Sequence, residues 1–278
     1  MIWYELTPFD TLFFRGGIPL ETGLPVSDVL FPPPPSMIAG AVWTAGGQCF
    51  SKKPTVKVGA ILLKKKDKYY VQAPYSWFVL KDNDILSAKE FNDRKSICSV
   101  NTPIPWVEGD VKNIGGEWID ITMLEKSDKK KYEKKEFFGN EDRVGISIDY
   151  NKKSAEESKL FMARHIRLCK DVTIVVAIDG EYGLGEKGVL RLGGESRMCS
   201  YKKMEIPPPL PNVSNGKYFV ALAPIQCEEE LLSKVFAAKT FIVSGWDMQE
   251  KTHKASQTWF YAGSVFTEKI GDQCIALS

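Results

Sequence analysis

The stretch RVGISIDYNKKSAEESKLFMARHIRL, residues 143–168, reads as two strand-like segments around a polar, basic centre. The segments 143–150 and 158–168 have the apolar content and spacing that are typical of strands. Between them, residues 151–157 (NKKSAEE) lack apolar periodicity and include Lys152 and Lys153. This stretch therefore predicts a hairpin that protrudes from the body of the protein, with the two lysines at its tip.

The rest of the chain favours strands joined by long irregular connections. Segments 2–6, 56–62 and 69–73 alternate apolar and polar residues, and 172–178 reads as a short buried strand. Two helices are predicted. One follows an N-cap at Ser36 and stops at Gly46, and the other spans 228–239, with glutamates in its first turn and Lys239 in its last. This order does not alternate regularly between strand and helix, so a pair of small α+β domains fits better than a doubly wound sheet.

The chain has 278 residues, of which 44% are hydrophobic and 26% are charged, as in an ordinary globular protein. The net charge of +2 excludes a uniformly basic surface but leaves room for local basic clusters. Its six cysteines are scattered singly and only two histidines are present, so structural zinc is not expected. With no signal peptide and no apolar run of membrane-spanning length, we expect a cytoplasmic protein with reduced thiols.

A lysine-rich segment, KSDKKKYEKK at 126–135, interrupts any apolar periodicity. We place the domain boundary here, which gives an N-terminal domain of residues 1–135 and a C-terminal domain of residues 136–278. The segment itself is either a solvated linker or a direct contact to RNA.

A literal GxGxxG occurs at residues 183–188, but it does not predict a nucleotide cofactor. A dinucleotide fingerprint must open a helix, whereas VLRLGG follows here, which is strand-like and broken by glycines. What remains is the glycine-rich run RLGGESR at 191–197, with Lys202 soon after it. Adjacent glycines let backbone amides approach a phosphate, and the arginines add charge-assisted contacts. The run is therefore either an RNA-backbone loop or a tight turn with solvated charges.

Near the N-terminus, FFRGG (13–17) is followed by FPPPPS (31–36). The prolines lead into the predicted helix, whose free amides form a site for an anion such as a phosphate. Two other interpretations stay open: a plain structural connection, and a polyproline ligand for another domain.

The sequence offers no recognisable catalytic group. His165 lies between Arg164 and Arg167, His253 lies in the polar segment 250–256, and neither belongs to an acid–base or nucleophile motif. No catalytic residue, metal ligand or cofactor site is therefore predicted.

Four motifs occur in order along almost the whole chain, from Pro8 to Phe266. They are PFDTLFFRGGIPLETG with FPPPPSMIAGAVW, DRVGISIDYNKKSAEESKLFMARHIRL, RLGGESR and YAGSVF. Together they resemble the third Cmr subunit of type III-B CRISPR effector complexes, a member of the RAMP superfamily. The resemblance implies two ferredoxin-like (RAMP/RRM-like) domains of the α+β class, with glycine-rich loops and a β-hairpin thumb.

The resemblance also implies a function. Members of this family are non-catalytic scaffolds that hold the 5′ tag of the guide RNA and bridge the large polymerase-like subunit to the backbone subunits. Such a tag is recognised through splayed bases and phosphate contacts, which suits glycine loops with interleaved arginines. The alternative is an RNA-processing endoribonuclease of the same superfamily, for which His165 is the candidate.

Carried onto this chain, 143–168 looks like the thumb, and the loops at Arg15, Ser36 and 193–197 look like the guide-facing ones. Family members usually continue past GSVF into a further glycine-rich loop and a last strand, whereas here the sequence runs TEKIGDQCIALS. The residues expected to bind RNA are Arg15, Gly16, Gly17, Ser36, Met37, Arg143, Lys152, Lys153, Arg164, Gly193, Gly194, Glu195, Ser196, Arg197 and Lys202.

Overall fold

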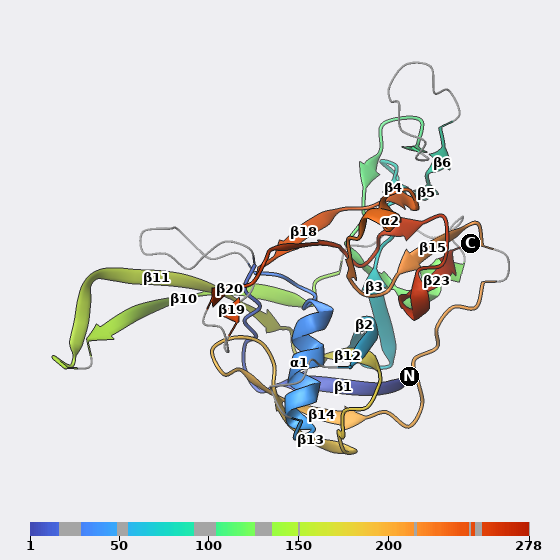
Figure 1. Ribbon diagram of the computed structural model, residues 1–278. Helices are drawn as coiled ribbons and strands as arrows, with labels where there is room; N and C mark the ends of the chain where they lie inside the picture. Colours follow the sequence, from blue (N-terminus) through green and yellow to red (C-terminus); the bar gives the residue numbers. More distant parts are fainter. Residues whose placement is uncertain are drawn as a thin grey trace.

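A computed structural model describes residues 1–16, 29–48, 55–91, 104–125, 135–149, 151–213, 216–244, 246–247 and 252–277. At its centre lies a seven-stranded sheet in which every strand is antiparallel to its neighbours (Figure 1). In spatial order its strands are β13 (Lys187–Arg191), β14 (Met198–Lys203), β1 (Ile2–Pro8), β12 (Val172–Asp179), β2 (Lys57–Lys65), β3 (Lys68–Gln72) and β9 (Trp118–Asp120).

The two faces of this sheet bury different apolar clusters. Tyr4 and Leu6 of β1 and Val176 of β12 face the helix α1 (Pro35–Ala45) and form one core with its Ile38 and Val42. On the other face, Leu62 and Val175 pack with Val220 and Val265 from the C-terminal part of the chain. The alternation along β1 and β12 therefore serves both layers, because successive side chains of a strand point to opposite faces.

Helix α1 starts differently from the prediction. The residue before it is Pro34, Pro35 is its first residue, and no side chain caps it, so the prediction of Ser36 as N-cap is wrong. Proline fits the first helical position because its missing N–H would have no partner there. Gly46 ends the helix as predicted, with its amide bonded to the Val42 carbonyl at 2.9 Å.

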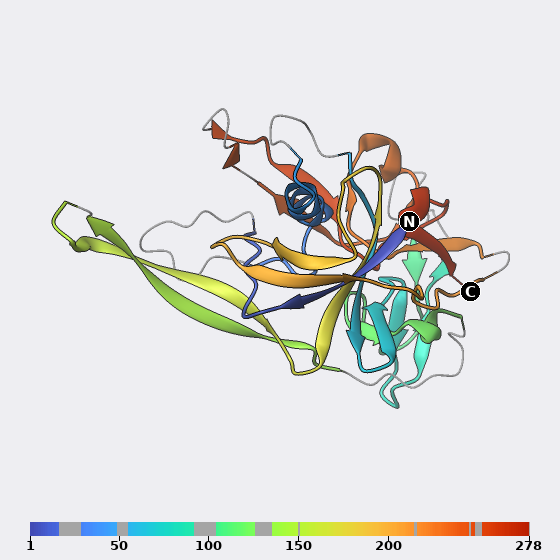
Figure 2. The same ribbon diagram turned by 90° about the horizontal axis from the view of Figure 1, so that it is seen from below.

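The predicted hairpin is present and is longer than expected. Strands β10 (Phe138–Asp149) and β11 (Ser154–Leu168) form a two-stranded sheet, which extends well away from the body of the protein (Figures 1 and 2). The predicted tip of residues 151–157 is wrong in its second half, since pairing resumes at Ser154. Asp149 tightens the turn by accepting hydrogen bonds from the amides of Asn151 and Lys152.

The C-terminal part forms a four-stranded sheet and a three-stranded sheet. The first has the order β17 (Val235–Ala237), β22 (Val265–Phe266), β15 (Tyr218–Ala221) and β23 (Cys274–Leu277). The second has the order β16 (Ile225–Gln226), β21 (Gln257–Phe260) and β18 (Thr240–Val243), and β19 (Trp246–Asp247) pairs with β20 (Thr252–His253). A strand therefore does follow GSVF, because β23 pairs with β15.

The helix predicted over 228–239 is wrong. Only α2 (Glu229–Leu232) is helical there, and Val235 to Ala237 form β17 against β22. Val235 and Phe236 belong to the branched and aromatic types that favour strands, and a cross-strand partner outweighs the weak helical charge pattern.

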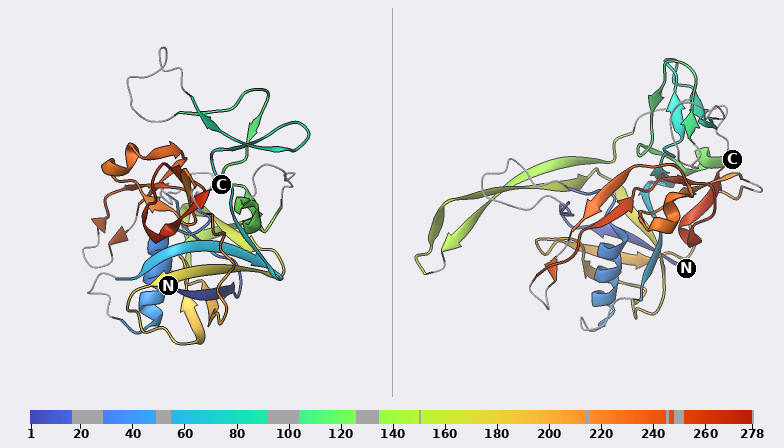
Figure 3. Two further views of the ribbon diagram at one scale, coloured as in Figure 1. Left: turned by 90° about the vertical axis from the view of Figure 1, so that its right-hand side faces the viewer. Right: turned by 45° about the horizontal axis from the view of Figure 1, so that its top comes forward.

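Small sheets complete the fold on the side away from α1 (Figure 3). They comprise β5 (Ile85–Ser87), β4 (Trp77–Val79) and β8 (Lys112–Asn113), and the pair β6 (Lys89–Glu90) and β7 (Pro105–Trp106). Two 3-10 turns, η1 (Ile121–Glu125) and η3 (Gly271–Gln273), are also present. The described chain is thus mostly β with few helices, as predicted, and none of its helices has the length and apolarity to cross a membrane.

The central sheet combines strands from both sides of the boundary placed at residue 135. Strands β1, β2, β3 and β9 precede it, whereas β12, β13 and β14 follow it. The segment 126–134 lies outside the described residues, and the division into domains 1–135 and 136–278 stays a prediction.

Candidate nucleic-acid interface

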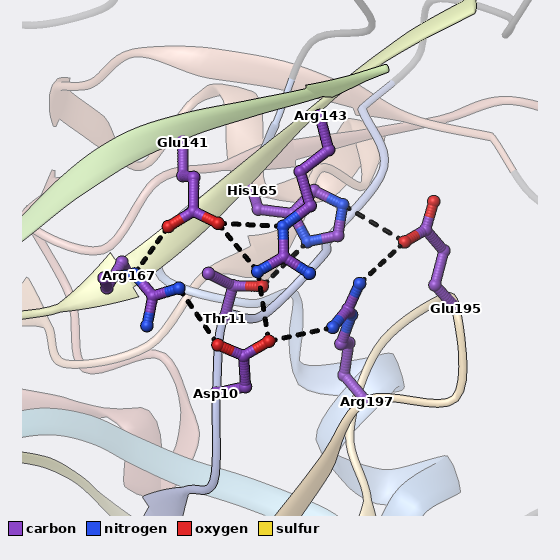
Figure 4. Close-up of polar contacts among 8 residues, drawn as sticks. All are labelled: Asp10, Thr11, Glu141, Arg143, His165, Arg167, Glu195 and Arg197. Carbon is purple, nitrogen blue, oxygen red and sulfur yellow. Dashed lines mark hydrogen bonds and ion pairs between the residues drawn. The ribbon is translucent and has the colours of Figure 1, made fainter. Parts of the chain in front are cut away.

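Three segments that are far apart in the sequence meet at one end of the central sheet, at the base of the hairpin (Figure 4). They are the segment after β1, the paired strands β10 and β11, and the glycine-rich loop between β13 and β14. Leu12 and Ile166 exchange two backbone hydrogen bonds of 2.8 Å, and the Gly194 amide donates to the Phe13 carbonyl, also at 2.8 Å. The segment after β1 therefore ties the hairpin to the glycine-rich loop through backbone bonds.

Polar side chains join the same three segments. We call them the hairpin-base network: Asp10, Thr11, Glu141, Arg143, His165, Arg167, Glu195 and Arg197. Asp10 is its centre, because one carboxylate accepts from Arg143 and Arg167 of the hairpin at 3.0 Å each and from Arg197 of the loop at 3.1 Å. A planar guanidinium matches a carboxylate well, which favours such shared pairing.

Two glutamates complete the network. Glu141 pairs with Arg143 at 2.7 Å and with Arg167, and Glu195 pairs with Arg197 at 3.0 Å. Three carboxylates thus balance three guanidinium groups. The network is nearly neutral as a whole, so Arg143 and Arg197, which the sequence predicted as RNA-binding residues, already have carboxylate partners within the chain.

His165 lies at the inner side of the network with its side chain fully buried. Its Nδ1 is 3.1 Å from the Thr11 hydroxyl, its Nε2 is 3.2 Å from a Glu195 oxygen, and its ring stacks on Phe13 with centroids 5.0 Å apart. Burial lowers the pKa of His165, since the charged imidazolium loses its hydration there. A neutral imidazole packed in this way fixes the loop against the hairpin.

Two carboxylates of the network, Asp10 and Glu141, are held in their ionised form. Hydrogen bonds from Arg167 and Arg143 lower the pKa of Glu141 to about 2. The pKa of Asp10 is also lowered, chiefly by its hydrogen bond from Arg143. Charge-assisted hydrogen bonds to the ionised form are the cause in both cases.

The glycine-rich loop approaches its neighbours so closely that its backbone sets the geometry. Gly193 has a φ of 89°, and a Cβ at this position would overlap the Phe13 carbonyl oxygen. Glu195 and Ser196 also have positive φ values, 52° and 55°, and both are exposed together with Gly194. The loop therefore presents three exposed residues, 194 to 196, next to the hairpin-base network.

The structure brings together part of the predicted RNA-binding set. Arg143 and residues 193–197 lie in or beside the network, as described above. Arg15 and Gly16 lie a few residues after Thr11 in the segment that follows β1. Arg15 forms an antiparallel β-bridge with Val29, and Gly16 is buried. Gly17 lies outside the described residues.

Other predicted residues lie elsewhere. Arg164 makes a bidentate pair with Asp142, at 2.7 and 2.9 Å, and Lys152 and Lys153 are exposed at the hairpin tip. Ser36 borders a cavity of about 850 Å³ that no network residue lines.

Two further predicted residues lie away from the network as well. Met37, a residue of α1, is partly buried and packs against the core. Lys202 is exposed on β14, where the pairing register sets it opposite Lys187 and Glu5.

The sequence analysis did not identify Asp10, Thr11, Glu141 and Arg167 as members of the site. Glu141 and Arg167 could have been found from the hairpin register. It sets Glu141 opposite His165 and Gly139 opposite Arg167, so Glu141 and Arg167 are diagonal neighbours on the two strands. No local signal marks Asp10, because its partners are more than 130 residues away in the sequence.

The comparisons with known proteins agree with one another. Residues 112–218 match the family described as CRISPR-associated protein (Cas_Cmr3). A curated relative, the CRISPR system CMR subunit Cmr3 of Saccharolobus solfataricus, is 28% identical over 157 residues, which are 51% of this chain and 49% of the relative. The match therefore spans about half the length of that relative.

Two solved structures share the fold. Both are titled as type III-B Cmr-beta bound to cognate target RNA, one of them with AMPPnP in state 1. The chain with AMPPnP has a TM-score of 0.64 and 18% identity, and the match covers 95% of this chain and 85% of that one. The other has a TM-score of 0.63 and 20% identity, with coverage of 96% and 86%.

Proposed function

We propose that this chain is a member of the Cmr3 family and an RNA-binding scaffold of a type III-B Cmr effector complex in cytoplasmic antiviral defence. In this proposal it holds the 5′ tag of the guide RNA and bridges the large polymerase-like subunit to the backbone subunits. The family membership is the premise, and the roles of individual residues are argued below from their surroundings.

The observation that carries the proposal is the docking of the glycine-rich loop onto the base of the hairpin. The network fixes the loop, and the exposed residues 194–196 can then approach a ribose or phosphate closely. A preformed loop binds RNA at a lower entropic cost than a loop that must be ordered on binding.

Within this proposal the predicted residues have different roles. Lys152 and Lys153 are exposed at the tip and can meet phosphates directly. Arg143 and Arg197 already pair with carboxylates, so they act first by positioning the loop and contact RNA only with the faces that remain exposed.

The arrangement of the central strands supports a ferredoxin-like domain. Strands β14, β1, β12 and β2 are neighbours in this order and antiparallel throughout, and α1 connects β1 to β2 on one face. Numbered along the chain, this is the order 4-1-3-2, which the ferredoxin-like pattern of strands and helices produces. The protruding hairpin β10–β11 is the candidate thumb.

The burial of His165 supports a non-catalytic role over the endoribonuclease alternative. A general acid or base must reach the reacting hydroxyl or phosphate directly or through one water. His165 is enclosed by Phe13, Thr11 and Glu195 and has no exposed surface. Its contacts are those of a residue that positions the loop.

Purification of the tagged chain from its native host, followed by sequencing of the bound RNA, tests the proposal. We expect short RNAs that share one repeat-derived 5′ tag, together with the other Cmr subunits. Recovery of the chain without RNA and without other subunits would contradict the scaffold function. Cleavage of repeat RNA by the purified chain, lost in His165→Gln, would favour the endoribonuclease instead.

A further inference from the structure

The turn between β2 and β3 has three lysines in four positions, Lys65, Lys66 and Lys68, with Asp67 between them. The pairing register sets Lys65 directly opposite Lys68, and like charges in this arrangement destabilise a strand pair. Lys66 has a φ of 57°, a conformation that favours glycine or asparagine over a residue with a long side chain. The turn therefore has two local energetic costs that packing within the chain does not explain.

These lysines surround a concave site, which we call the lysine cleft. It has a volume of about 460 Å³ and is lined by Lys65, Lys66, Asp67, Lys68, Tyr70, Lys135, Glu136 and Phe137. Four lysines face two carboxylates, so the lining groups carry a net charge of +2. Lys65, Lys66 and Lys68 form no ion pair with any residue that the structure describes.

Two of the four lysines, Lys65 and Lys135, contact aromatic rings. The Lys65 ammonium lies 5.9 Å from the centroid of the Phe137 ring, and the Lys135 ammonium lies 5.3 Å from that of the Tyr70 ring. Both rings are buried, and they pack on each other with centroids 4.5 Å apart. The contacts orient the two ammonium groups, and a cation–π contact by itself leaves the charge of an ammonium group in place.

The chemistry of the cleft favours a phosphate ligand over a protein partner. Its exposed residues are Lys66, Asp67, Lys68 and Glu136, none of which is apolar. A protein interface needs an apolar centre, and lysine is depleted there, whereas lysine is a common binder of phosphate. An anionic backbone would offset the repulsion between Lys65 and Lys68.

The position of the cleft connects it to the proposed guide-facing loop. Strands β1 and β2 run parallel because both are antiparallel to β12. Their last residues, Pro8 and Lys65, therefore lie at the same end of the sheet. The order β14-β1-β12-β2 leaves three strand spacings, about 14 Å, between the strand that follows the glycine-rich loop and the strand that leads into the cleft. One single-stranded nucleic acid can span that distance, since such sites cover about 4–16 nucleotides.

From these observations we infer that the lysine cleft is a second nucleic-acid site, which binds the phosphodiester backbone of a single strand where it continues past the glycine-rich loop. The inference rests on the proposed function for the identity of that strand. The chemistry would suit single-stranded RNA or DNA, and the experiment includes both.

Fluorescence anisotropy of the purified chain with labelled 12-nucleotide oligouridine and oligodeoxythymidine, measured over a range of salt concentrations, tests the inference. The double variant Lys66→Glu/Lys68→Glu should bind more weakly. The slope of log K against log salt should fall by roughly 1.4 for two lost contacts to a single strand. The matched control is Lys112→Glu/Lys269→Glu, which makes the same charge change at two exposed lysines outside the cleft and should bind like the wild type.

Thermal unfolding gives a second readout. Lys68→Glu converts the like-charge pair with Lys65 into an opposite-charge pair, so the thermal midpoint should rise while nucleic-acid binding falls. A variant that merely misfolds would lower both. Opposite signs therefore separate a ligand site from structural damage.

Three other results would contradict the inference. Equal binding by the wild type and the cleft variant would overturn the inference and leave RNA binding through the loop intact. No binding of either oligonucleotide by the wild type would overturn both the cleft and RNA binding by the chain alone. Displacement of the oligonucleotide by an equal concentration of decaglutamate would assign the cleft to an acidic protein segment and overturn the nucleic-acid inference.

Discussion

Asp10 shows how one short side chain can organise a site made from distant segments. Its carboxylate accepts from Arg143, Arg167 and Arg197, which belong to both strands of the hairpin and to the glycine-rich loop. Asp10 therefore joins the hairpin and the loop by charge, in addition to the contact between His165 and Glu195 and the backbone bond between Gly194 and Phe13. Asp142, in contrast, pairs with Arg164 within the hairpin.

We expect Asp10→Asn to destabilise the protein more than Asp142→Asn, because three guanidinium groups lose their shared partner. The Asp10 side chain is 43% exposed, so after solvent screening the loss is about 1 kcal/mol of unfolding free energy. Urea unfolding of both variants measures the difference. Equal losses would show that Asp10 does not have this central role.

The groups of the network also predict how stability depends on pH. The pKa of His165 lies below its ordinary value of 6.5 in the folded chain, so the unfolded chain takes up a proton first as the pH falls. The contribution of His165 to the free energy of unfolding is therefore fully present above pH 6.5 and declines below it. A second decline should follow in more acidic solution, where Glu141, with a folded pKa of about 2 against an ordinary 4.5, protonates first in the unfolded chain.

Thermal midpoints measured from pH 8 to pH 3 should show both declines. His165→Gln should reduce the decline just below pH 6.5 and leave the more acidic one in place, since the carboxylates are unchanged. An unaltered profile in this variant would mean that His165 does not titrate differently in the folded and unfolded chain.

Gly193 is the position of the loop where a side chain is least tolerated. Its φ of 89° and the nearby Phe13 carbonyl both exclude a Cβ, so Gly193→Ala should cost roughly 2 kcal/mol or more of unfolding free energy. Gly139 in β10 is the control, because a Cβ there meets no atom within 4 Å. Chemical denaturation of the two alanine variants should separate them, and a neutral Gly193→Ala would contradict the described loop geometry.

At the level of secondary-structure elements, the hairpin divides into an anchored base and a free arm. The base contains the network residues and the backbone bonds between Leu12 and Ile166. Further out, Val144, Ile146 and Ile148 are about half exposed or more. These side chains therefore contribute little to the core. Exposed apolar side chains of this kind are typical of a contact to another molecule.

Replacing residues 145–161 by an Asn-Gly turn should leave the thermal midpoint of the isolated chain nearly unchanged, since the two strands of the arm pair with each other and Ile146 and Ile148 are about half exposed. The same variant should copurify with less guide RNA and with fewer of the other subunits. A control hairpin with only residues 151–153 exchanged for glycine and serine should retain assembly if the arm, rather than its tip lysines, makes the docking contact. A large drop in the midpoint would show that the arm is part of the core.

At the level of the whole molecule, the central sheet unites the two halves of the chain. Strand β1 lies between β12 and β14, both of which come from beyond residue 135. The first half alone would leave β1 without either neighbour, and the edges so exposed invite aggregation.

A chain divided between residues 125 and 135 should therefore not fold as two independent pieces. We expect fragments 1–125 and 135–278 to be unfolded or aggregated when expressed separately, and to form one folded complex when expressed together. Circular dichroism and size-exclusion chromatography check both conditions. A folded fragment 1–125 on its own would support the division into domains that the sequence predicted.

The sequence by itself indicated the resemblance to the Cmr3 family, the hairpin and most of the central strands. These features rest on local patterns: alternation along the strands, proline and glycine at the ends of α1, and motifs in a fixed order. Local patterns also misled in three places. At Ser36 the position of a proline decided the outcome, at residues 228–239 a cross-strand partner did, and at the hairpin tip the strand pairing resumed at Ser154.

Only the tertiary structure decided which charges are free. The arginines at 143, 164 and 197 looked like RNA contacts in the sequence, but carboxylates balance them after folding, one of these being Asp10, which is 133 residues from Arg143. The lysines of the β2–β3 turn lack such partners among the described residues and line a cleft, although nothing in their local sequence set them apart from other surface lysines. The physical reason is that pairing between charges depends on distance in space, which the fold alone sets.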